Sequence, residues 1–204
     1  MPLKKTFWPI AILAVSLSCN NSTPSANKSE IPNHPRLPET ADPPVDKSVM
    51  DMSYFPPEYP QLKMTGKAKG DPVIRIIYSR PHKDQRKILG EVVQINQPWR
   101  LGANEATEIE FFRDVIILNK PVAAGRYVLY AIPGSDKWQL ILNGDLFTWG
   151  LRIDKSKDLF SFSVPVRRTS VPMEIFSMQF GKTATGAELT IAWDTLLVSL
   201  PITF

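Results

Sequence analysis

The residues best suited to chemistry lie together in one short stretch, Trp99–Thr107. This stretch contains an aromatic ring, a guanidinium, an amide and a carboxylate, at Trp99, Arg100, Asn104 and Glu105. A carboxylate in a cleft can act as an acid, a base or a hydrogen-bond acceptor, and a guanidinium can hold a phosphate or carboxylate group. Glu105 is therefore the first candidate for an acid or base, and the whole stretch is a candidate binding loop.

The same stretch also has a structural interpretation. Gly102 and Asn104 tolerate the left-handed backbone that a tight bend requires. Asn104, Glu105 and Thr107 have side chains that can satisfy backbone groups at a buried corner, with Arg100 pairing the carboxylate. Because the residues after Thr107 alternate between polar and apolar, we expect a rigid bend that leads into a strand and leaves some polar atoms accessible to solvent.

Few other side chains support catalysis. The chain has two histidines, His34 and His82, so a histidine-rich metal site cannot form, and a Ser-His-Asp triad in the domain would depend on His82. The sequence contains no Gly-x-Ser-x-Gly elbow, no His-Glu-x-x-His and no phosphate-binding glycine loop. We expect no cofactor and no metal, and we interpret His82 as a solvated loop residue, with a role as general base as the alternative.

Arginines and tryptophans offer a second kind of site. Arg80 and Arg86 lie near an expected strand end and would, with Arg100, hold an anionic group; ordinary surface arginines are the alternative. Trp99 and Trp149 fall in expected loops and are candidates for stacking on a sugar ring, whereas alternating strand patterns place Trp138 and Trp193 in the core.

Short stretches with strand-like alternation follow one another from Asp71 to the C-terminus. The expected strands are residues 73–79, 91–95, 107–112, 115–118, 126–132, 138–143, 160–166, 176–180, 189–193 and 196–202. A helical turn is expected within 83–90, and Pro133–Asp136 predicts a hairpin turn. Many short strands without a long helix predict an all-β domain, an antiparallel β-sandwich or jelly roll.

The N-terminus has the layout of an export signal. Two lysines precede an apolar run at residues 7–17, which is shorter than the roughly 20 residues that span a bilayer. Cys19, the single cysteine, follows directly and resembles the lipid-carrying cysteine of a bacterial lipoprotein. We expect a lipoprotein-type signal peptide over 1–18 and acylation, such as palmitate, at Cys19. A plain secretory signal or a retained anchor is the alternative.

The composition changes after Cys19. Residues 19–60 are rich in proline and polar side chains, and from Asn20 to Lys47 large apolar residues are almost absent. Such a segment buries too little surface to offset the entropy of ordering, so we expect a disordered tether, followed by a β-sandwich domain over 61–204. The aromatic residues near Tyr54 would pack on the outside of the domain or contact a partner. No run of basic residues is present, which argues against nucleic-acid binding.

Several motifs occur in order along the expected domain. They are Tyr78-Ser79-Arg80-Pro81, Arg86-Lys87-Ile88-Leu89-Gly90-Glu91, the stretch Trp99–Thr107, Ala124-Gly125-Arg126-Tyr127, Ile132-Pro133-Gly134 and Trp149-Gly150. Together they resemble the bacterial exported family described as a domain of unknown function, DUF2911. The resemblance covers about residues 70–204 and departs from the family at Gln85, where a glycine usually precedes the arginine, and after Gly150. It implies a fold and an envelope location, and it implies no activity.

Three hypotheses about function follow. The first is a membrane-tethered lipoprotein of the bacterial cell envelope, periplasmic or surface-facing. Its domain would be non-catalytic and would bind a glycan, a peptide or a small anionic ligand through residues Arg80, Arg86, Trp99, Arg100, Asn104 and Glu105. The second is a hydrolase-like enzyme that uses Glu105 with His82 or an arginine. The third is a structural envelope component. The expected partner in all three is the lipid bilayer, through the N-terminal anchor.

Overall fold

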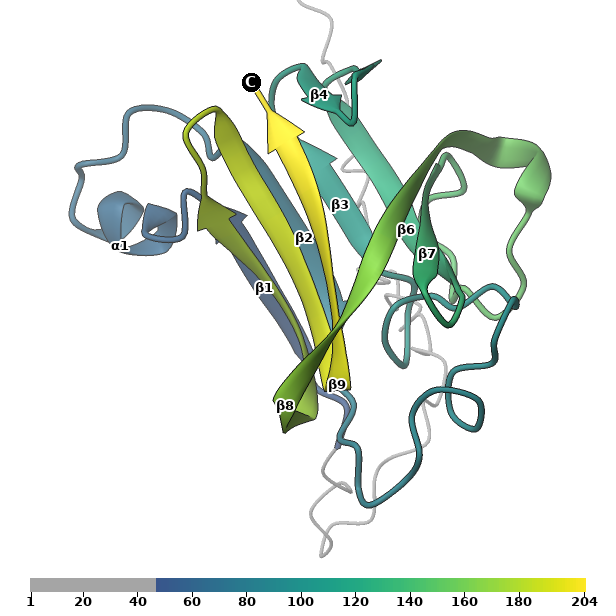
Figure 1. Cartoon of the computed structure of the whole chain (residues 1–204). Helices are drawn as coiled ribbons and strands as arrows, with labels where there is room; N and C mark the ends of the chain where they lie inside the picture. Colours follow the sequence, from purple (N-terminus) through teal and green to yellow (C-terminus); the bar gives the residue numbers. More distant parts are fainter. Residues whose placement is uncertain (1–46) are drawn as a thin grey trace, which may run out of the picture. The chain divides into compact units, whose positions relative to one another are not determined.

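The computed structural model describes residues 47–204, and strands dominate this part of the chain (Figure 1). The strands are β1 (Met50–Phe55), β2 (Ile74–Ser79), β3 (Glu108–Phe111), β4 (Val115–Ile117), β5 (Lys120–Val122), β6 (Gly125–Pro133), β7 (Lys137–Asn143), β8 (Asp158–Lys182) and β9 (Gly186–Thr203). The expected signal peptide, Cys19 and most of the expected tether lie outside the described residues. The prediction of an all-β antiparallel domain is confirmed.

All nine strands join one antiparallel sheet in the order β1-β2-β3-β6-β7-β8-β9-β4-β5. The long strand β8 connects the two halves, because its first part pairs with β7 and its later part pairs with β9. The register of the β8–β9 pair shifts between Arg168 and Ser177, and Asp194 on the opposite strand has a φ of +52°. Figure 1 shows the paired ribbon bending at this level. Bulges of this kind let a strand change direction without ending the sheet.

The two halves of the sheet enclose a single apolar core. The inward side chains of β2, Ile74, Ile76 and Tyr78, alternate with partly exposed ones, as expected for a strand with one buried face. The Tyr78 hydroxyl bonds to the backbone of Met178 on β8, accepting from its N–H at 3.0 Å and donating to its carbonyl at 3.2 Å. The sheet therefore folds back so that β2 packs against the far end of β8, and one core cluster spans both halves.

Three local features differ from the sequence expectations. β1 lies within the segment 19–60 that the sequence assigned to the tether, and it pairs along its length with β2. A short helix, α1 (Tyr59–Met64), follows it on the surface. The helical turn expected in 83–90 and the strand expected in 91–95 are both wrong: this region is a series of turns, in which Leu89 and Val93 form an isolated bridge. Its apolar residues Ile88 and Val93 are buried as anchors of a loop, which explains the misleading pattern.

One three-residue 3-10 turn, η1 (Lys155–Lys157), precedes β8. Within residues 47–204, no helix is long and apolar enough to cross a membrane.

Candidate functional site

The stretch Trp99–Thr107 forms an irregular bend between a single bridge at Trp99 and strand β3. Leu101 and Asn104 have φ angles of +57° and +56°, in the left-handed region that non-glycine residues rarely adopt. Leu101 is fully buried, so its side chain fixes the bend to the core. The expectation of a bend leading into a strand is confirmed.

Ser79, at the end of β2, holds the middle of this bend. Its hydroxyl accepts a hydrogen bond from the Ala103 N–H and donates one to the Ala103 carbonyl. Gly102 lies so close that a Cβ there would be 2.8 Å from the Ser79 hydroxyl and 2.9 Å from its carbonyl oxygen. The glycine is therefore required by close packing as well as by its φ of +149°.

Two further hydrogen bonds hold the bend in shape. The buried Thr107 hydroxyl donates to the Leu101 carbonyl at 2.7 Å, and the Asn104 side-chain amide donates to the Ser48 carbonyl at 3.1 Å. Asn104 and Thr107 thus have the corner-stabilising contacts that the structural interpretation predicted. The inner side of the bend is structural, and its outer side lines two cavities.

The first cavity, which we call the arginine pocket, has a volume of about 340 Å³. Its lining residues are Ser48, Pro81, Arg86, Val92, Pro98, Trp99, Arg100, Gly102, Ala103, Gly150, Leu151 and Trp193. The rings of Trp99 and Trp193 stack with centroids 5.9 Å apart and an interplanar angle of 17°. Two guanidinium groups and two indole rings therefore meet in one concave surface that backbone contacts hold in shape.

The two arginines of this pocket are oriented by backbone carbonyls. Arg86 donates to the carbonyls of Lys83 and His82 within its own loop, and Arg100 donates to the Trp149 carbonyl at 3.3 Å. Burial lowers the pKa of the Arg100 guanidinium, and the nearby charge of Glu105 opposes that change. Neither arginine forms a salt bridge with any residue of 47–204. Both therefore keep hydrogen-bonding capacity for an anion.

The second cavity, which we call the glutamate pocket, has a volume of about 370 Å³. Its lining residues are Met50, Ile77, Glu105, Ala106, Glu108, Phe147, Thr148 and Trp149. The loop 147–151 contributes to both pockets and is fixed to the bend: the Ala106 N–H donates to the Thr148 carbonyl at 3.2 Å. A Cβ at Gly150 would lie 3.0 Å from those of Ala106 and Arg100, which shows how closely the loop and the bend pack.

The remaining candidates lie elsewhere. The guanidinium of Arg80 forms a salt bridge with Asp51 at 3.1 Å and donates to the Phe176 carbonyl, so it joins β1 to β8 and does not line either pocket. His82 is exposed, and its backbone forms a bridge with Ile175. Glu105 and His82 do not line a common cavity.

Comparison with known families gives one result. The family model described as "protein of unknown function (DUF2911)" matches residues 60–202. The chain belongs to the DUF2911 family. No curated protein and no solved structure matches the chain.

Two residues at which the sequence is expected to depart from the DUF2911 pattern are Gln85, next to Arg86 of the arginine pocket, and Leu151, in its lining. Gln85 has a φ of +61°, a left-handed conformation that favours glycine. Leu151 follows Trp149-Gly150 and lines the same pocket with 74% of its surface exposed. The rim of the pocket therefore carries an exposed apolar side chain at Leu151 and a left-handed residue, Gln85, beside Arg86.

Several residues that build these pockets carry little signal in the sequence. The motif Tyr78-Ser79-Arg80-Pro81 contains Ser79 but does not reveal that its hydroxyl anchors the bend. Trp193 and Trp138 were expected in the core, and both are 2% exposed, yet the edge of Trp193 also reaches the arginine pocket. Phe147 had no signal in the sequence, and it is the most exposed aromatic residue of the described chain.

Proposed function

We propose that this protein is a non-catalytic binding module of the bacterial envelope that holds a small organic anion in the arginine pocket. One observation carries the proposal: Arg86 and Arg100 line the same concave surface as the stacked pair Trp99 and Trp193. A pocket of 300–1,000 Å³ with apolar walls and a few convergent polar groups is the usual form of a small-molecule site.

The chemistry of the lining favours an anion with a ring or other apolar part. Guanidinium groups bind carboxylate and phosphate through paired hydrogen bonds, and they do so best where water is partly excluded. Arg100 is half-buried, so its guanidinium has lost part of its hydration on folding, and this burial lowers its pKa. An incoming anion would offset that cost. Trp99, Pro98 and Pro81 provide the apolar wall against which the rest of the ligand would lie.

Catalysis by Glu105 with His82 receives less support. Glu105 lines the glutamate pocket, and His82 lines neither of the two pockets. A general acid and base that act on one substrate must both come within hydrogen-bond distance of it. The Glu105→Gln variant separates the two ideas: a binding module keeps its affinity for the anion, whereas an acid–base enzyme loses turnover by about 10²–10⁴-fold.

The site is tested with phenyl phosphate, which combines an anion with a flat ring, and with benzyl alcohol as the uncharged comparison. Isothermal titration of the full chain is expected to show saturable binding of phenyl phosphate only. Arg100→Gln should weaken it at least tenfold and Arg86→Gln at least threefold, because each removes a charged donor. Arg167→Gln, on an exposed part of β8, is the matched control and should leave binding unchanged.

Two results would contradict the proposal. One is equal affinity for phenyl phosphate and benzyl alcohol, which would mean that the arginines do not select the ligand. The other is unchanged affinity after both Arg86→Gln and Arg100→Gln in the same chain.

The proposed envelope location rests on the N-terminal sequence, in which an apolar run at residues 7–17 comes shortly before Cys19. We propose that acylation of Cys19 tethers the domain to a membrane. Cys19→Ala, followed by separation of membrane and soluble fractions, is expected to move the protein out of the membrane fraction. Unchanged membrane association would reject lipid attachment at this residue.

A further inference from the structure

The glutamate pocket has a lining opposite in charge to that of the arginine pocket. Its charged lining residues, Glu105 and Glu108, are both acidic, and the rest of its wall is largely apolar, with Trp149 and Phe147 as the aromatic members. Trp149 is 51% exposed and Phe147 is 83% exposed, although large aromatic side chains are usually buried. Aromatic faces next to carboxylates are the surroundings in which organic cations bind.

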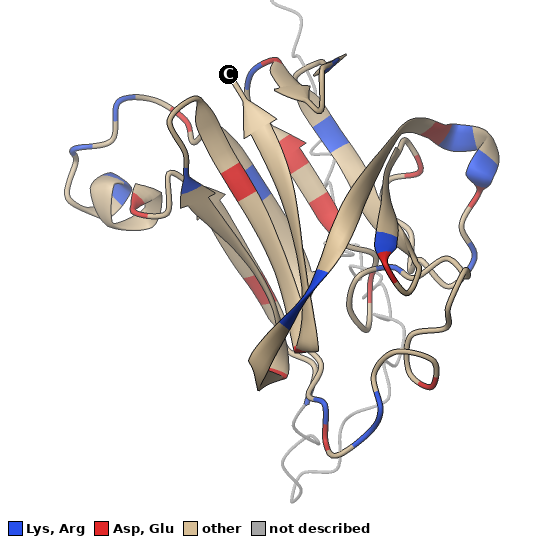
Figure 2. Ribbon diagram, viewed as in Figure 1, with Lys and Arg blue, Asp and Glu red and all other residues tan. Residues whose placement is uncertain are grey.

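Phe147 is held in this exposed position by its backbone. Its φ of +60° is a conformation that bulky residues rarely adopt, and its N–H donates to a Glu108 carboxylate oxygen at 3.3 Å. The guanidinium of Arg126 lies 5.8 Å from the centroid of the Phe147 ring. The ring therefore already interacts with one cation. Figure 2 shows the acidic positions of β3 beside a basic position of the neighbouring β6.

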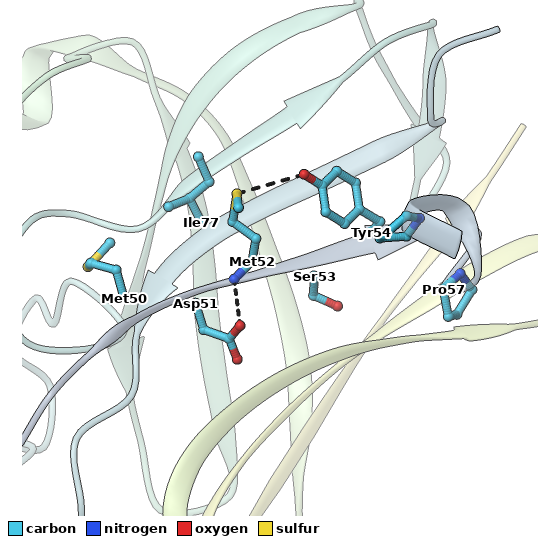
Figure 3. Close-up of a pocket in the computed structure, with 8 residues that line it drawn as sticks. Met50, Asp51, Met52, Ser53, Tyr54, Pro57 and Ile77 are labelled. Carbon is cyan, nitrogen blue, oxygen red and sulfur yellow. Dashed lines mark hydrogen bonds between the residues drawn. The ribbon is translucent and has the colours of Figure 1, made fainter. Parts of the chain in front are cut away.

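The pocket continues into an apolar groove along β1, shown in Figure 3. This groove has a volume of about 590 Å³ and shares Met50 and Ile77 with the glutamate pocket. Figure 3 shows Met52 and Ile77 on the same side of β1, with Tyr54 farther along the strand. Met50 and Met52 are 42% and 52% exposed, and their flexible thioether chains adapt to ligands of different shape.

We propose that the glutamate pocket and this groove together bind a small amphiphilic cation, an ammonium group with an alkyl chain. The ammonium lies against the faces of Trp149 and Phe147, close to the carboxylate of Glu105, and the chain lies over Met50, Ile77 and Met52. Charge complementarity selects this occupant: Glu108 is paired with Arg126 at 3.8 Å, whereas Glu105 forms no salt bridge within residues 47–204. Glu105 and the aromatic side chains lie at one end of the site, and apolar side chains line the other. The site is separate from the arginine pocket and does not depend on the proposed function.

The test uses hexyltrimethylammonium as the probe and compares it with 1-hexanol and tetramethylammonium, which lack the charge and the chain respectively. Titration of the full chain, followed by calorimetry and tryptophan fluorescence, is expected to show saturable binding of hexyltrimethylammonium. Each of the other two compounds should bind at least tenfold more weakly. The ammonium group and the alkyl chain each contact one half of the site. A compound that has only one of them therefore does not reproduce the affinity of hexyltrimethylammonium.

Substitutions of lining residues test whether hexyltrimethylammonium binds in the glutamate pocket. Trp149→Ala should weaken hexyltrimethylammonium at least tenfold and Glu105→Gln at least threefold. Glu91→Gln, an exposed carboxylate in the loop before the bend, should have no effect. Glu105→Gln is not expected to change phenyl phosphate binding by more than twofold, so a failure of one site is distinguishable from a failure of the other.

The proposal is overturned if 1-hexanol binds as tightly as hexyltrimethylammonium, or if Trp149→Ala and Glu105→Gln both bind the probe like the unchanged protein. Because Glu105 is exposed and glutamine has the same shape, Glu105→Gln keeps the test valid even if Trp149→Ala does not fold.

Discussion

Ser79 and Ala103 are joined by a reciprocal pair of hydrogen bonds, in which one serine hydroxyl serves both the N–H and the carbonyl of the alanine. Ser79 is fully buried and ends β2, and Ala103 is in the middle of the bend that lines the arginine pocket. A single hydroxyl thus ties the candidate binding loop to the sheet. This inner contact fixes the position of Arg100 and Glu105, which line the two pockets on the outer side of the bend.

Ser79→Ala should therefore lower the stability of the domain. The substitution leaves a donor and an acceptor of Ala103 without their partner, and an unsatisfied buried polar group costs about 1–3 kcal/mol. The free energy of unfolding is measured in urea. Ser163→Ala, at an exposed position of β8, is the control and should change it by less than about 0.5 kcal/mol. An equal effect of the two variants would show that the hydroxyl does not anchor the bend.

Gly102→Ala should be destabilising for a different reason. The new Cβ would approach both the hydroxyl and the carbonyl oxygen of Ser79, at a φ that L-residues rarely adopt. Backbone strain and overpacking each cost about 1–3 kcal/mol. In the double variant with Ser79→Ala, the new Cβ no longer meets the hydroxyl but still meets the carbonyl oxygen of residue 79. The double variant should therefore remain less stable than Ser79→Ala alone. Full recovery in urea unfolding would show that the carbonyl contact does not matter.

Arg80 has a structural role, in contrast to Arg86 and Arg100, which line the arginine pocket. Its guanidinium joins Asp51 of β1 to the Phe176 carbonyl of β8 and lies outside the arginine pocket. Arg80→Gln should lower the free energy of unfolding by about 0.5–1.5 kcal/mol, since the ion pair is partly exposed. It should leave phenyl phosphate affinity within twofold of the unchanged protein. A tenfold loss of affinity in titration calorimetry would instead return Arg80 to the binding site.

The sequence was most informative where local pattern and tertiary structure agree. Alternation predicted the strand after Thr107, and residues 108–111 do form β3. Asn104 and Gly102 tolerate a left-handed backbone conformation, and this property predicted the bend. These signals are local, because they depend on the backbone preferences of a few neighbouring residues. Periodicity alone failed in 83–95, where apolar residues anchor a loop to the core.

The grouping of the candidate residues was not predictable in the same way. Arg86 and Arg100 meet in one pocket, whereas Arg80 has the same charge and lies nearer to Arg86 in the sequence but points to Asp51. Trp193 reaches the arginine pocket because the late part of β8 and its partner β9 pack back over the first half of the sheet. Such contacts depend on the long-range order of the strands, which no short motif encodes.

Two of the buried tyrosines, Tyr78 and Tyr130, make stability dependent on alkaline pH. Burial raises the pKa of Tyr78, whose hydroxyl bonds to the backbone of Met178. Burial, and then the hydrogen bond to Asp158, raise the pKa of Tyr130, whose hydroxyl lies 2.9 Å and 3.0 Å from the two carboxylate oxygens. Both hydroxyls therefore stay protonated in the folded protein at a pH where an unfolded tyrosine ionises, about pH 10.

The sign of the effect follows from proton linkage. Above pH 10 the unfolded chain binds fewer protons than the folded one, so the stabilisation from the neutral hydroxyls is complete below pH 10 and is lost as the pH rises toward the folded-state pKa. Each tyrosine contributes a slope of up to about 1.4 kcal/mol per pH unit. Urea unfolding of Tyr130→Phe and Tyr78→Phe between pH 8 and pH 11 should show a shallower decline than the unchanged protein, although both variants start from a lower value at pH 8. Parallel curves for all three proteins would mean that these hydroxyls do not carry the alkaline dependence.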